Sequence, residues 1–324
     1  MKIFITGATG FIGRRLVDRL LSGGHEVVAL VRNKEHGLPK GIEIAYGDVL
    51  TPDSFKESGQ RCDRLYHLAA LITFVPEHKA ELLRVNGQGT INVLAAAGRW
   101  NVPCSVVVSS ACTIGLSHSK KDILDENSIL REGLAENNPY LASKILAERA
   151  ALEYTDSQKV VIVNPTTVYG PGDKTLNSGT LILKIARAAI LPVPPGGSNV
   201  VDVDDVVDGI IAAGERGKSG KRYILGYHNL SFSEIFSTIT EVVENRPILI
   251  AIPKVLRKPA ELMAEITGKL GHNRFLTAQI VGDLFAFKYY SSKRANQDLN
   301  WQPKYSFRES IERAWDFYLR EGLV

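Results

Sequence analysis

A tyrosine and a lysine four residues apart, Tyr140 and Lys144, are the side chains best suited to chemistry in this chain. The segment around them predicts a helix, because Asn138 can cap its start and Pro139 suits its first position. Residues four apart share one helix face. A free phenol has a pKa of about 10, and a fixed ammonium beside it favours the phenolate and lowers that pKa. The pair could therefore exchange protons with a hydroxyl or carbonyl substrate near neutral pH.

A glycine-rich turn lies at the start of the chain. Apolar residues 3–5 predict a buried strand and residues 12–21 have helical apolar spacing, so Gly7, Gly10 and Gly13 fall where strand becomes helix. Such a turn lets the backbone approach a pyrophosphate, and the start of the helix offers free N–H groups. The sequence therefore predicts a dinucleotide-binding site at this turn.

Further apolar runs alternate with helical patterns, which predicts an α/β fold with a doubly wound parallel sheet, the Rossmann fold. Ligands of such sheets gather outside the carboxyl ends of the strands. One predicted strand ends in two serines, and either Ser109 or Ser110 could contact a reacting oxygen there. His67 lies inside an apolar run, so we interpret it as a structural residue.

The end of the second predicted strand, residues 25–32, bears on the choice of cofactor. An acidic residue there would bind the ribose hydroxyls of NAD and repel a 2′-phosphate, but this strand ends in Arg32. An arginine can pair with that phosphate, and Arg14, Arg15 and Lys34 could add to the positive field. We therefore expect NADP(H) as the cofactor, with NAD as the alternative.

Length and composition limit the function classes. The 324 residues carry a net charge of +4 with 23% charged residues, which lacks the concentrated basic patch of nucleic-acid binding. The three cysteines have no metal-site spacing, so we expect no metal. The chain starts directly on a predicted strand, and no apolar run approaches the roughly 20 residues of a membrane span. We therefore expect a cytoplasmic protein that does not cross a membrane.

These motifs together resemble those of the extended short-chain dehydrogenases/reductases, the NAD(P)-dependent epimerase/dehydratase family. The resemblance covers nearly the whole chain and is strongest for the dihydroflavonol-reductase-like group, which includes bacterial proteins named hopanoid-associated sugar epimerases. The segments that carry it are Thr6 to Gly13, Gly47-Asp48-Val49, Ser109 to Gly115, Tyr140 to Lys144, and Asn164-Pro165 with Gly170-Pro171.

The resemblance implies roles for individual residues. It places the catalytic hydroxyl on Ser110, with Tyr140 as the residue that gives or takes the substrate proton and Lys144 beside it. Together with the argument for Arg32, it implies cofactor contacts from Gly7, Thr9, Gly10, Phe11, Ile12, Arg32, Asp48, Val49, Leu68, Ala69, Ala70, Tyr140, Lys144, Asn164, Pro165 and Val168.

The residues near this trio bear on the reaction. Family dehydratases carry an Asp-Glu pair after the catalytic hydroxyl, where this chain has Ala111-Cys112. Sugar-nucleotide epimerases hold a diphosphate with arginines; Ser198-Asn199 occupies one such place, and Arg274 is a candidate for the other. We therefore predict an NADP(H)-dependent oxidoreductase that reduces a ketone or aldehyde or oxidises the alcohol. The alternatives are an NAD-dependent nucleotide-sugar epimerase and a cofactor-sensing protein without turnover.

The expected organisation is a cofactor-binding domain over residues 1–174, to which strands from about 198–226 return, with residues 175–324 mostly forming a mainly helical substrate lobe. The small-molecule substrate would be chosen by this lobe and by loops such as the one at Phe74. The basic amphipathic segment 252–263 could touch a membrane or lipid, although packing within the lobe is the favoured interpretation. In relatives two helices pair into a dimer, so we expect a homodimer.

Overall fold

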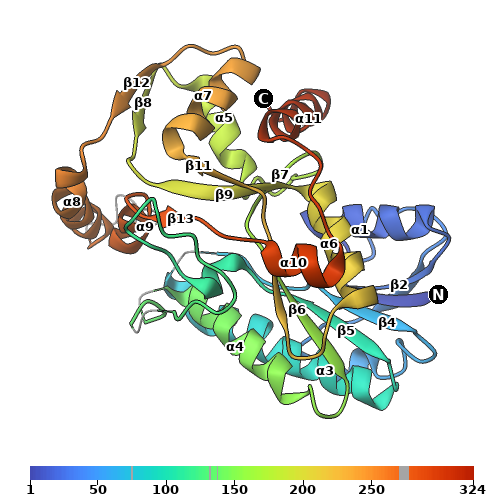
Figure 1. Ribbon diagram of the computed structural model, residues 1–324. Coiled ribbons are helices and arrows are strands. Elements are labelled where there is room, and N and C mark those ends of the chain that lie inside the picture. The colour runs from blue at the N-terminus through green and yellow to red at the C-terminus, as the bar shows by residue number, and fades with distance from the viewer. Residues whose placement is uncertain (74–75, 131–132, 137, 270–276) are drawn as a thin grey trace.

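A seven-stranded sheet forms the base of the molecule in the computed structural model (Figure 1). Its strand order is β10-β6-β5-β4-β1-β2-β3, and every neighbouring pair is parallel. Because the chain winds outward in both directions from β1, this is the predicted doubly wound Rossmann sheet. The strands are β1 (Lys2–Thr6), β2 (Glu26–Val31), β3 (Glu43–Tyr46), β4 (Arg64–His67), β5 (Cys104–Val108), β6 (Lys159–Pro165) and β10 (Arg222–Leu225).

The structure describes all residues except 74–75, 131–132, 137 and 270–276. Phe74 and Arg274, which the sequence linked to substrate choice, lie outside the described residues. None of the described helices has the length and apolarity needed to cross a bilayer. The three cysteines are free, and the described residues contain no cluster of three or more His, Cys, Asp or Glu side chains that could hold a metal.

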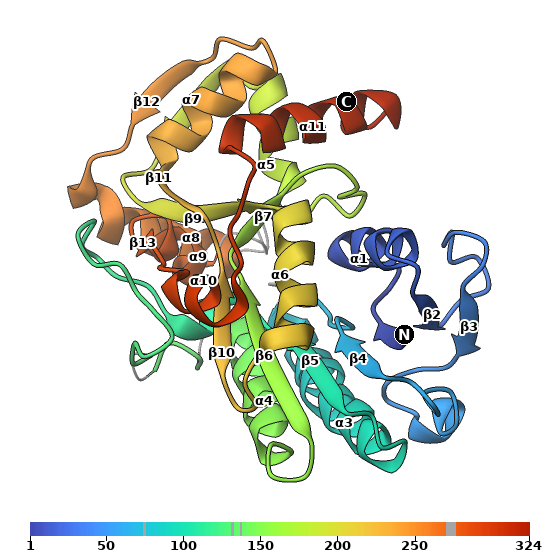
Figure 2. The ribbon, with the colours of Figure 1, turned by 45° about the vertical axis from the view of Figure 1, so that its right-hand side comes forward.

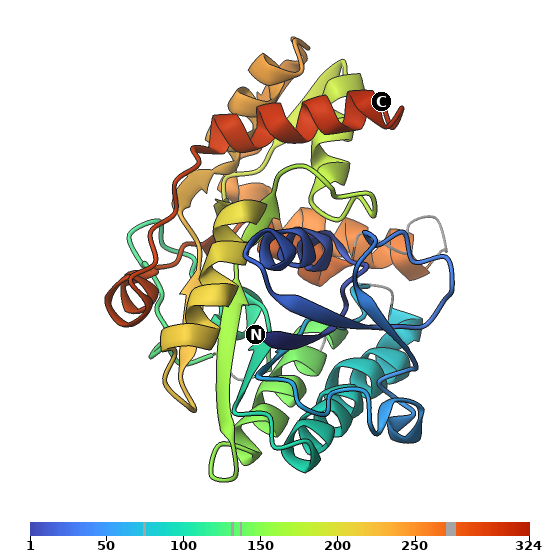
Figure 3. The ribbon, with the colours of Figure 1, turned by 90° about the vertical axis from the view of Figure 1, so that its right-hand side faces the viewer.

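Helices cover both faces of the sheet (Figures 2 and 3). On one face α1 (Phe11–Ser22) packs against α6 (Val203–Arg216), and on the other α3 (Gly89–Arg99) packs against α4 (Pro139–Glu153). Ile3 and Ile5 join the apolar cluster on the α1 side and Phe4 joins the one on the α3 side, because alternate residues of a strand point to opposite faces. Burial on both faces explains the continuous apolar run of β1.

Four consecutive helical segments lead from the loop after β4 to the end of α3. They are η2 (Pro76–His78), α2 (Lys79–Leu82), η3 (Leu83–Gln88), which is a π-helix, and α3. Asn86 lies in the π-helical turn and is buried. Its side chain accepts from the Leu71 amide at 2.7 Å and donates to the Leu71 carbonyl and to Ser143 Oγ, at 3.0 and 2.8 Å. The irregular turn thereby ties the loop after β4 to α4, a use of π-turns that is common near functional sites.

A smaller lobe lies over the carboxyl edge of the sheet and has its own apolar core, which includes Ile182, Ile235 and Ile311. We use this name for the elements that follow β6, apart from α6, β10 and α10. They are β7 (Thr167–Tyr169), α5 (Gly179–Arg187), β8 (Ile190–Val193), β9 (Gly197–Asp202), β11 (His228–Ser231), α7 (Phe232–Val242), β12 (Ile248–Ala251), η5 (Lys254–Leu256), α8 (Arg257–Lys269), α9 (Ala278–Asp283), β13 (Phe287–Lys288) and α11 (Phe307–Arg320).

The late strands divide between two sheets. β10 joins the main sheet beside β6, as expected for residues 198–226. β9 does not, because it pairs with β11, β13 and β7 in a separate sheet of the smaller lobe. The remaining short elements are η1 (Pro52–Phe55), η4 (Ala111–Ile114) and α10 (Lys293–Leu299).

A buried carboxylate connects the smaller lobe to the base. Asp202 caps α6 by accepting from the Asp204 amide at 2.8 Å. Asp204 itself accepts two bonds of 2.7 Å from Arg15 of α1 and another from Arg313 of α11. Burial acts to raise the pKa of Asp204, but the bonds from the two arginines outweigh it and hold the pKa below its usual value. Three helices from distant parts of the chain therefore meet at one ionised side chain.

Candidate active site

A cavity of about 640 Å³ follows the carboxyl ends of β1 to β4. Its walls come from the turns after these strands and from η2, α2 and η3. Nine of the residues expected to contact the cofactor line it: Gly7, Thr9, Gly10, Arg32, Asp48, Val49, Leu68, Ala69 and Ala70. The sequence analysis missed Glu77, Glu81 and Arg84 on the opposite wall, because an irregular helix has no spacing that indicates which residues face a cavity.

The glycine turn has the geometry that a bound pyrophosphate requires. Gly7 has φ of +74°, and a Cβ there would lie 2.6 Å from the Ala69 nitrogen. A Cβ on Gly13 would lie 2.1 Å from the Gly7 carbonyl oxygen, so the helix could not pack this closely with a larger residue. α1 begins after Gly10 with no side-chain cap and no acidic residue in its first turn. Its first N–H groups are therefore open to an anion.

The basic residues near this turn have different partners. Arg14 donates to the carbonyls of Thr9, His36 and Gly37 at 3.0, 2.7 and 2.6 Å, and Arg15 binds Asp204. Arg14 keeps its uncompensated charge beside the loop after β2, whereas the charge of Arg15 is paired with that of Asp204, which corrects the expectation that Arg15 adds to the field at the end of β2. Arg32 is exposed on the cavity wall, and its side chain forms no hydrogen bond or ion pair with other described residues.

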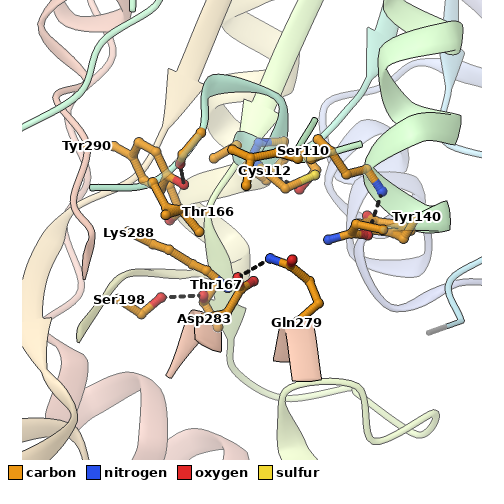
Figure 4. A pocket seen from close by; sticks show the side chains of 17 residues that line it. Ser110, Cys112, Tyr140, Thr166, Thr167, Ser198, Gln279, Asp283, Lys288 and Tyr290 are labelled. Carbon is orange, nitrogen blue, oxygen red and sulfur yellow. Dashed lines mark hydrogen bonds and ion pairs between the residues drawn. The ribbon is translucent and has the colours of Figure 1, made fainter. Parts of the chain in front are cut away.

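A second cavity, of about 230 Å³, lies between the end of β5, the start of α4 and the smaller lobe. Figure 4 shows Ser110, Cys112 and Tyr140 on one side of this catalytic cavity. The opposite side carries polar side chains from β9, α9 and β13: Ser198, Gln279, Asp283 and Lys288. The sequence analysis missed this second wall, because Ser198 is far in the chain from residues 279–288 and those residues lie on short elements.

The two candidate serines differ in their surroundings. Ser110 lines the cavity together with Tyr140 and accepts from the Cys112 amide at 3.3 Å. Ser109 is buried, and its hydroxyl has no hydrogen-bond partner among the described residues. Of the two, only Ser110 lies where it could contact a bound substrate.

The start of α4 aims Tyr140 at this cavity. Asn138 caps the helix by accepting from the Leu141 amide at 2.9 Å, and Pro139 takes the first helical position, both as predicted. Lys144 follows one turn later and is 5% exposed, and its Nζ donates to the Val108 carbonyl at 3.2 Å. The helix thus places the Tyr140 phenol on the cavity wall and the Lys144 ammonium behind that wall.

Burial dominates the proton affinities of this pair. It raises the pKa of Tyr140 well above its ordinary value, with a further rise from Cys112 and an opposing effect of the bond to Ser110. Burial lowers the pKa of Lys144, against the effects of Cys112 and Glu148. The expected lowering of the phenol pKa by the lysine is therefore not found in the protein alone. Tyr140 is a protonated phenol at neutral pH and can act as an acid.

A buried polar network lies beneath Ser110. Nδ2 of Asn164 donates to Glu148 Oε1, Thr113 Oγ1 and the Ser110 carbonyl, at 2.6, 3.0 and 3.1 Å. The buried Glu148 carboxylate needs such donors. Arg222 Nη1 lies 3.5 Å from Oε2, the other oxygen of this carboxylate. Asn164 therefore faces this network and lines neither cavity.

Of the remaining residues expected to contact the cofactor, one lines the catalytic cavity and four line neither cavity. Pro165 lines the catalytic cavity, whereas Phe11, Ile12, Lys144 and Val168 do not line either cavity.

His67, interpreted as structural, is buried between Thr6 Oγ1 and Thr90 Oγ1 at 2.7 and 3.0 Å, and burial lowers its pKa to about 3. It is a neutral hydrogen-bonded core residue.

The sheet, the glycine turn and the strand-end cavity define a Rossmann-fold enzyme that binds a dinucleotide. The chain belongs to the NAD dependent epimerase/dehydratase family, whose model matches residues 3–226. It is thus an NAD(P)-dependent enzyme of the extended short-chain dehydrogenase/reductase type, as the motifs predicted.

Similar proteins include several reductases. The chain is 32% identical to a protein of Synechocystis sp. named "Putative dihydroflavonol 4-reductase", over 99% of this chain and 95% of that protein. It is 29% identical to sterol demethylase protein B of Methylococcus capsulatus, over 82% and 81%. The crystal structure of gox2253 superimposes with a TM-score of 0.87 at 28% identity, covering 99% and 98% of the two chains. Thermus thermophilus UDP-glucose 4-epimerase, at 21% identity, full coverage and a TM-score of 0.77, shares the fold.

Proposed function

We propose that this protein is an NADP(H)-dependent oxidoreductase that reduces a ketone or aldehyde, or oxidises the corresponding alcohol. The observation that carries the proposal is that Ser110 and Tyr140 line the same cavity, with Lys144 buried one helical turn after Tyr140. The residues present suit the cofactor, because the glycine turn leaves the amino end of α1 open and the strand-end cavity leads from it. When bound there, the nicotinamide would supply or accept the hydride.

The protein groups supply the proton and orient the carbonyl. The Ser110 hydroxyl donates to the substrate oxygen and fixes its position. Tyr140, kept protonated by burial, donates its phenolic proton to the same oxygen as negative charge develops on it. By the family resemblance, the Lys144 ammonium one helical turn away would stabilise the phenolate that remains and hold the nicotinamide ribose.

The lining of the catalytic cavity favours a reductase over a nucleotide-sugar epimerase. Among the described residues that line it, Lys288 is the one basic side chain, and it is paired with Asp283 at 3.0 Å. A diphosphate carries negative charges that need several free cationic donors. A neutral carbonyl compound fits this wall better.

The preference for NADP(H) rests on Arg32 at the end of β2. Titration of NADPH and NADH into nucleotide-free protein tests it. We expect NADPH to bind about 10- to 100-fold more tightly, because a charge-assisted bond to phosphate contributes about 1.5–3 kcal/mol. Arg32→Ala should abolish this difference. Arg99→Ala, which removes an exposed arginine at the end of α3, should preserve it.

The nucleotide that copurifies with the protein separates the two activities. Protein that is empty as isolated and prefers NADPH supports the reductase, for which the cofactor is a consumed cosubstrate. NAD that stays bound through purification would mean that the cofactor is recycled within each turnover, and would favour the NAD-dependent nucleotide-sugar epimerase.

We also propose a homodimer formed through the outer faces of α3 and α4. Leu146 and Leu152 of α4 are exposed apolar side chains on this side of the base. Sedimentation velocity should show a dimer that Leu152→Glu dissociates, and a monomeric unmodified protein would contradict the proposal.

A further inference from the structure

The outer side of α8 carries large apolar side chains in solvent. Leu262 and Met263 are 58% and 62% exposed, and Ile266 is exposed as well. Directly before the helix, Val255 is 80% exposed and Leu256 is also exposed. A helix on a protein surface ordinarily turns its apolar side inward. Here several neighbouring side chains leave their apolar surface uncovered.

The polar side of the same helix faces the protein. Ala264 is buried, and Arg257 Nε donates to Glu261 Oε1 at 2.7 Å on this inner side. These two residues line a hollow of about 590 Å³ together with α9. At about 100° per residue, Leu262, Met263 and Ile266 lie on the opposite side of α8. The helix is thus amphipathic with its apolar side outward.

The apolar surface continues into β12. This strand is the edge of a two-stranded sheet with β8, and its Ile248, Leu249 and Ile250 are all exposed. Figure 1 shows β12 and α8 along the margin of the smaller lobe that lies away from α1. We call the exposed side chains of residues 246–266 the docking face.

The charges of the docking face indicate what covers it. The docking face carries three exposed basic side chains, Arg246, Lys254 and Lys258, and one exposed acidic side chain, Glu265, while Arg257 and Glu261 pair on the inner side of α8. In a two-fold dimer the same patch meets itself, so these positive charges would repel one another. An anionic bilayer instead offers phosphates to the basic groups and acyl chains to the apolar ones.

We propose that the docking face binds the surface of an anionic lipid bilayer, with the apolar side of α8 inserted between headgroups. The hollow behind α8 shares Leu116, Leu134, Gln279 and Asp283 with the catalytic cavity. Docking therefore places the bilayer against the outer side of a helix whose inner side borders the hollow next to this cavity. This inference goes beyond the proposed function and can be tested without turnover.

Flotation with vesicles tests the proposal on the full chain. Protein is mixed with vesicles of phosphatidylcholine alone or of phosphatidylcholine with phosphatidylglycerol, and the floating fraction is measured. We expect flotation with the anionic vesicles that decreases with added salt, and little with phosphatidylcholine alone. Lys254→Gln and Lys258→Gln should each weaken partition about fivefold, since a basic residue near such a surface contributes about 1 kcal/mol.

The double variant Val255→Glu/Leu262→Glu should abolish flotation, and because both side chains are exposed it should keep the unfolding temperature. The matched control is Leu319→Glu, which alters an exposed leucine on α11 and should float normally. Three outcomes would overturn the proposal: no flotation of the unmodified protein, flotation of the double variant, or dissociation of a dimer by the double variant. The last would identify the face as a contact between copies of the chain.

Discussion

The cofactor cavity and the far wall of the catalytic cavity are built in different ways. The cofactor cavity is lined mostly by residues that directly follow parallel strands, such as Gly7, Arg32, Asp48 and Ala69. The far wall of the catalytic cavity combines Ser198 with residues 279–290, which only the fold brings together. A site at strand ends can thus be located from local pattern, whereas a site between lobes cannot.

The largest expected effect on catalysis is at the side of the catalytic cavity that carries Ser110 and Tyr140. Tyr140→Phe removes the proton donor and should lower kcat for carbonyl reduction about 10²- to 10⁴-fold. NADPH affinity, which depends on the other cavity, should be unchanged. Tyr154→Phe, at the end of the same helix, is the control and should keep activity. Equal kcat in Tyr140→Phe and unmodified protein would show that this phenol is not the acid.

The pH dependence of the reaction rates tests whether Tyr140 acts as a proton donor in reduction. Because burial raises the pKa of Tyr140, its protonated form persists above neutral pH. Reduction should be constant through neutral pH and fall as pH rises through that pKa. The rate of oxidation, which needs the phenolate, should rise over the same range. A reduction rate that rises through neutral pH would contradict the assignment of Tyr140 as acid.

The adjacent serines give a matched pair at the same strand end. Ser110→Ala should lower kcat about 10²-fold, because it removes a donor to the developing charge. Ser109→Ala changes a buried hydroxyl outside the cavity and should leave kcat unchanged. If the two losses were reversed, Ser109 would be the functional hydroxyl. Steady-state kinetics with both variants decides this.

The contact at Asp204 between the base and the smaller lobe should contribute to the free energy of unfolding. Asp204→Asn weakens the bonds that join α1 and α11 to α6, and should reduce the free energy of unfolding by about 2–3 kcal/mol. Asp208→Asn, which affects a more exposed pair with Arg19, should cost at most about 1 kcal/mol. Urea unfolding measures both. The lowered pKa of Asp204 stabilises the fold above the unfolded pKa, so this difference should shrink as pH falls through the folded pKa.

The smallest effect is expected at the far wall. Lys288→Met removes a cation from the cavity and should raise KM about tenfold for a carbonyl substrate with a polar group, at unchanged NADPH affinity. Lys293→Met, on the exposed start of α10, is the control. A change in cofactor affinity rather than KM would mean that the two cavities are not separate in function.

The sequence by itself determined the parts that depend on local chemistry. Gly7 and Gly13 are at positions where a side chain would collide with backbone, and Asn138 with Pro139 starts the helix that places Tyr140 four residues before Lys144. Continuous apolar runs identified the buried strands. Each of these features depends on neighbouring residues and on backbone geometry, so pattern and spacing reveal it.

Only the tertiary structure decided which partners distant residues have. It paired Arg15 with Asp204, placed Lys288 across from Tyr140 and turned the apolar side of α8 outward. The sequence pattern predicted that this segment is amphipathic, but it did not predict which side of α8 faces solvent. The physical reason is that an amphipathic pattern specifies two sides of a helix, while the packing of the whole chain decides which side meets solvent.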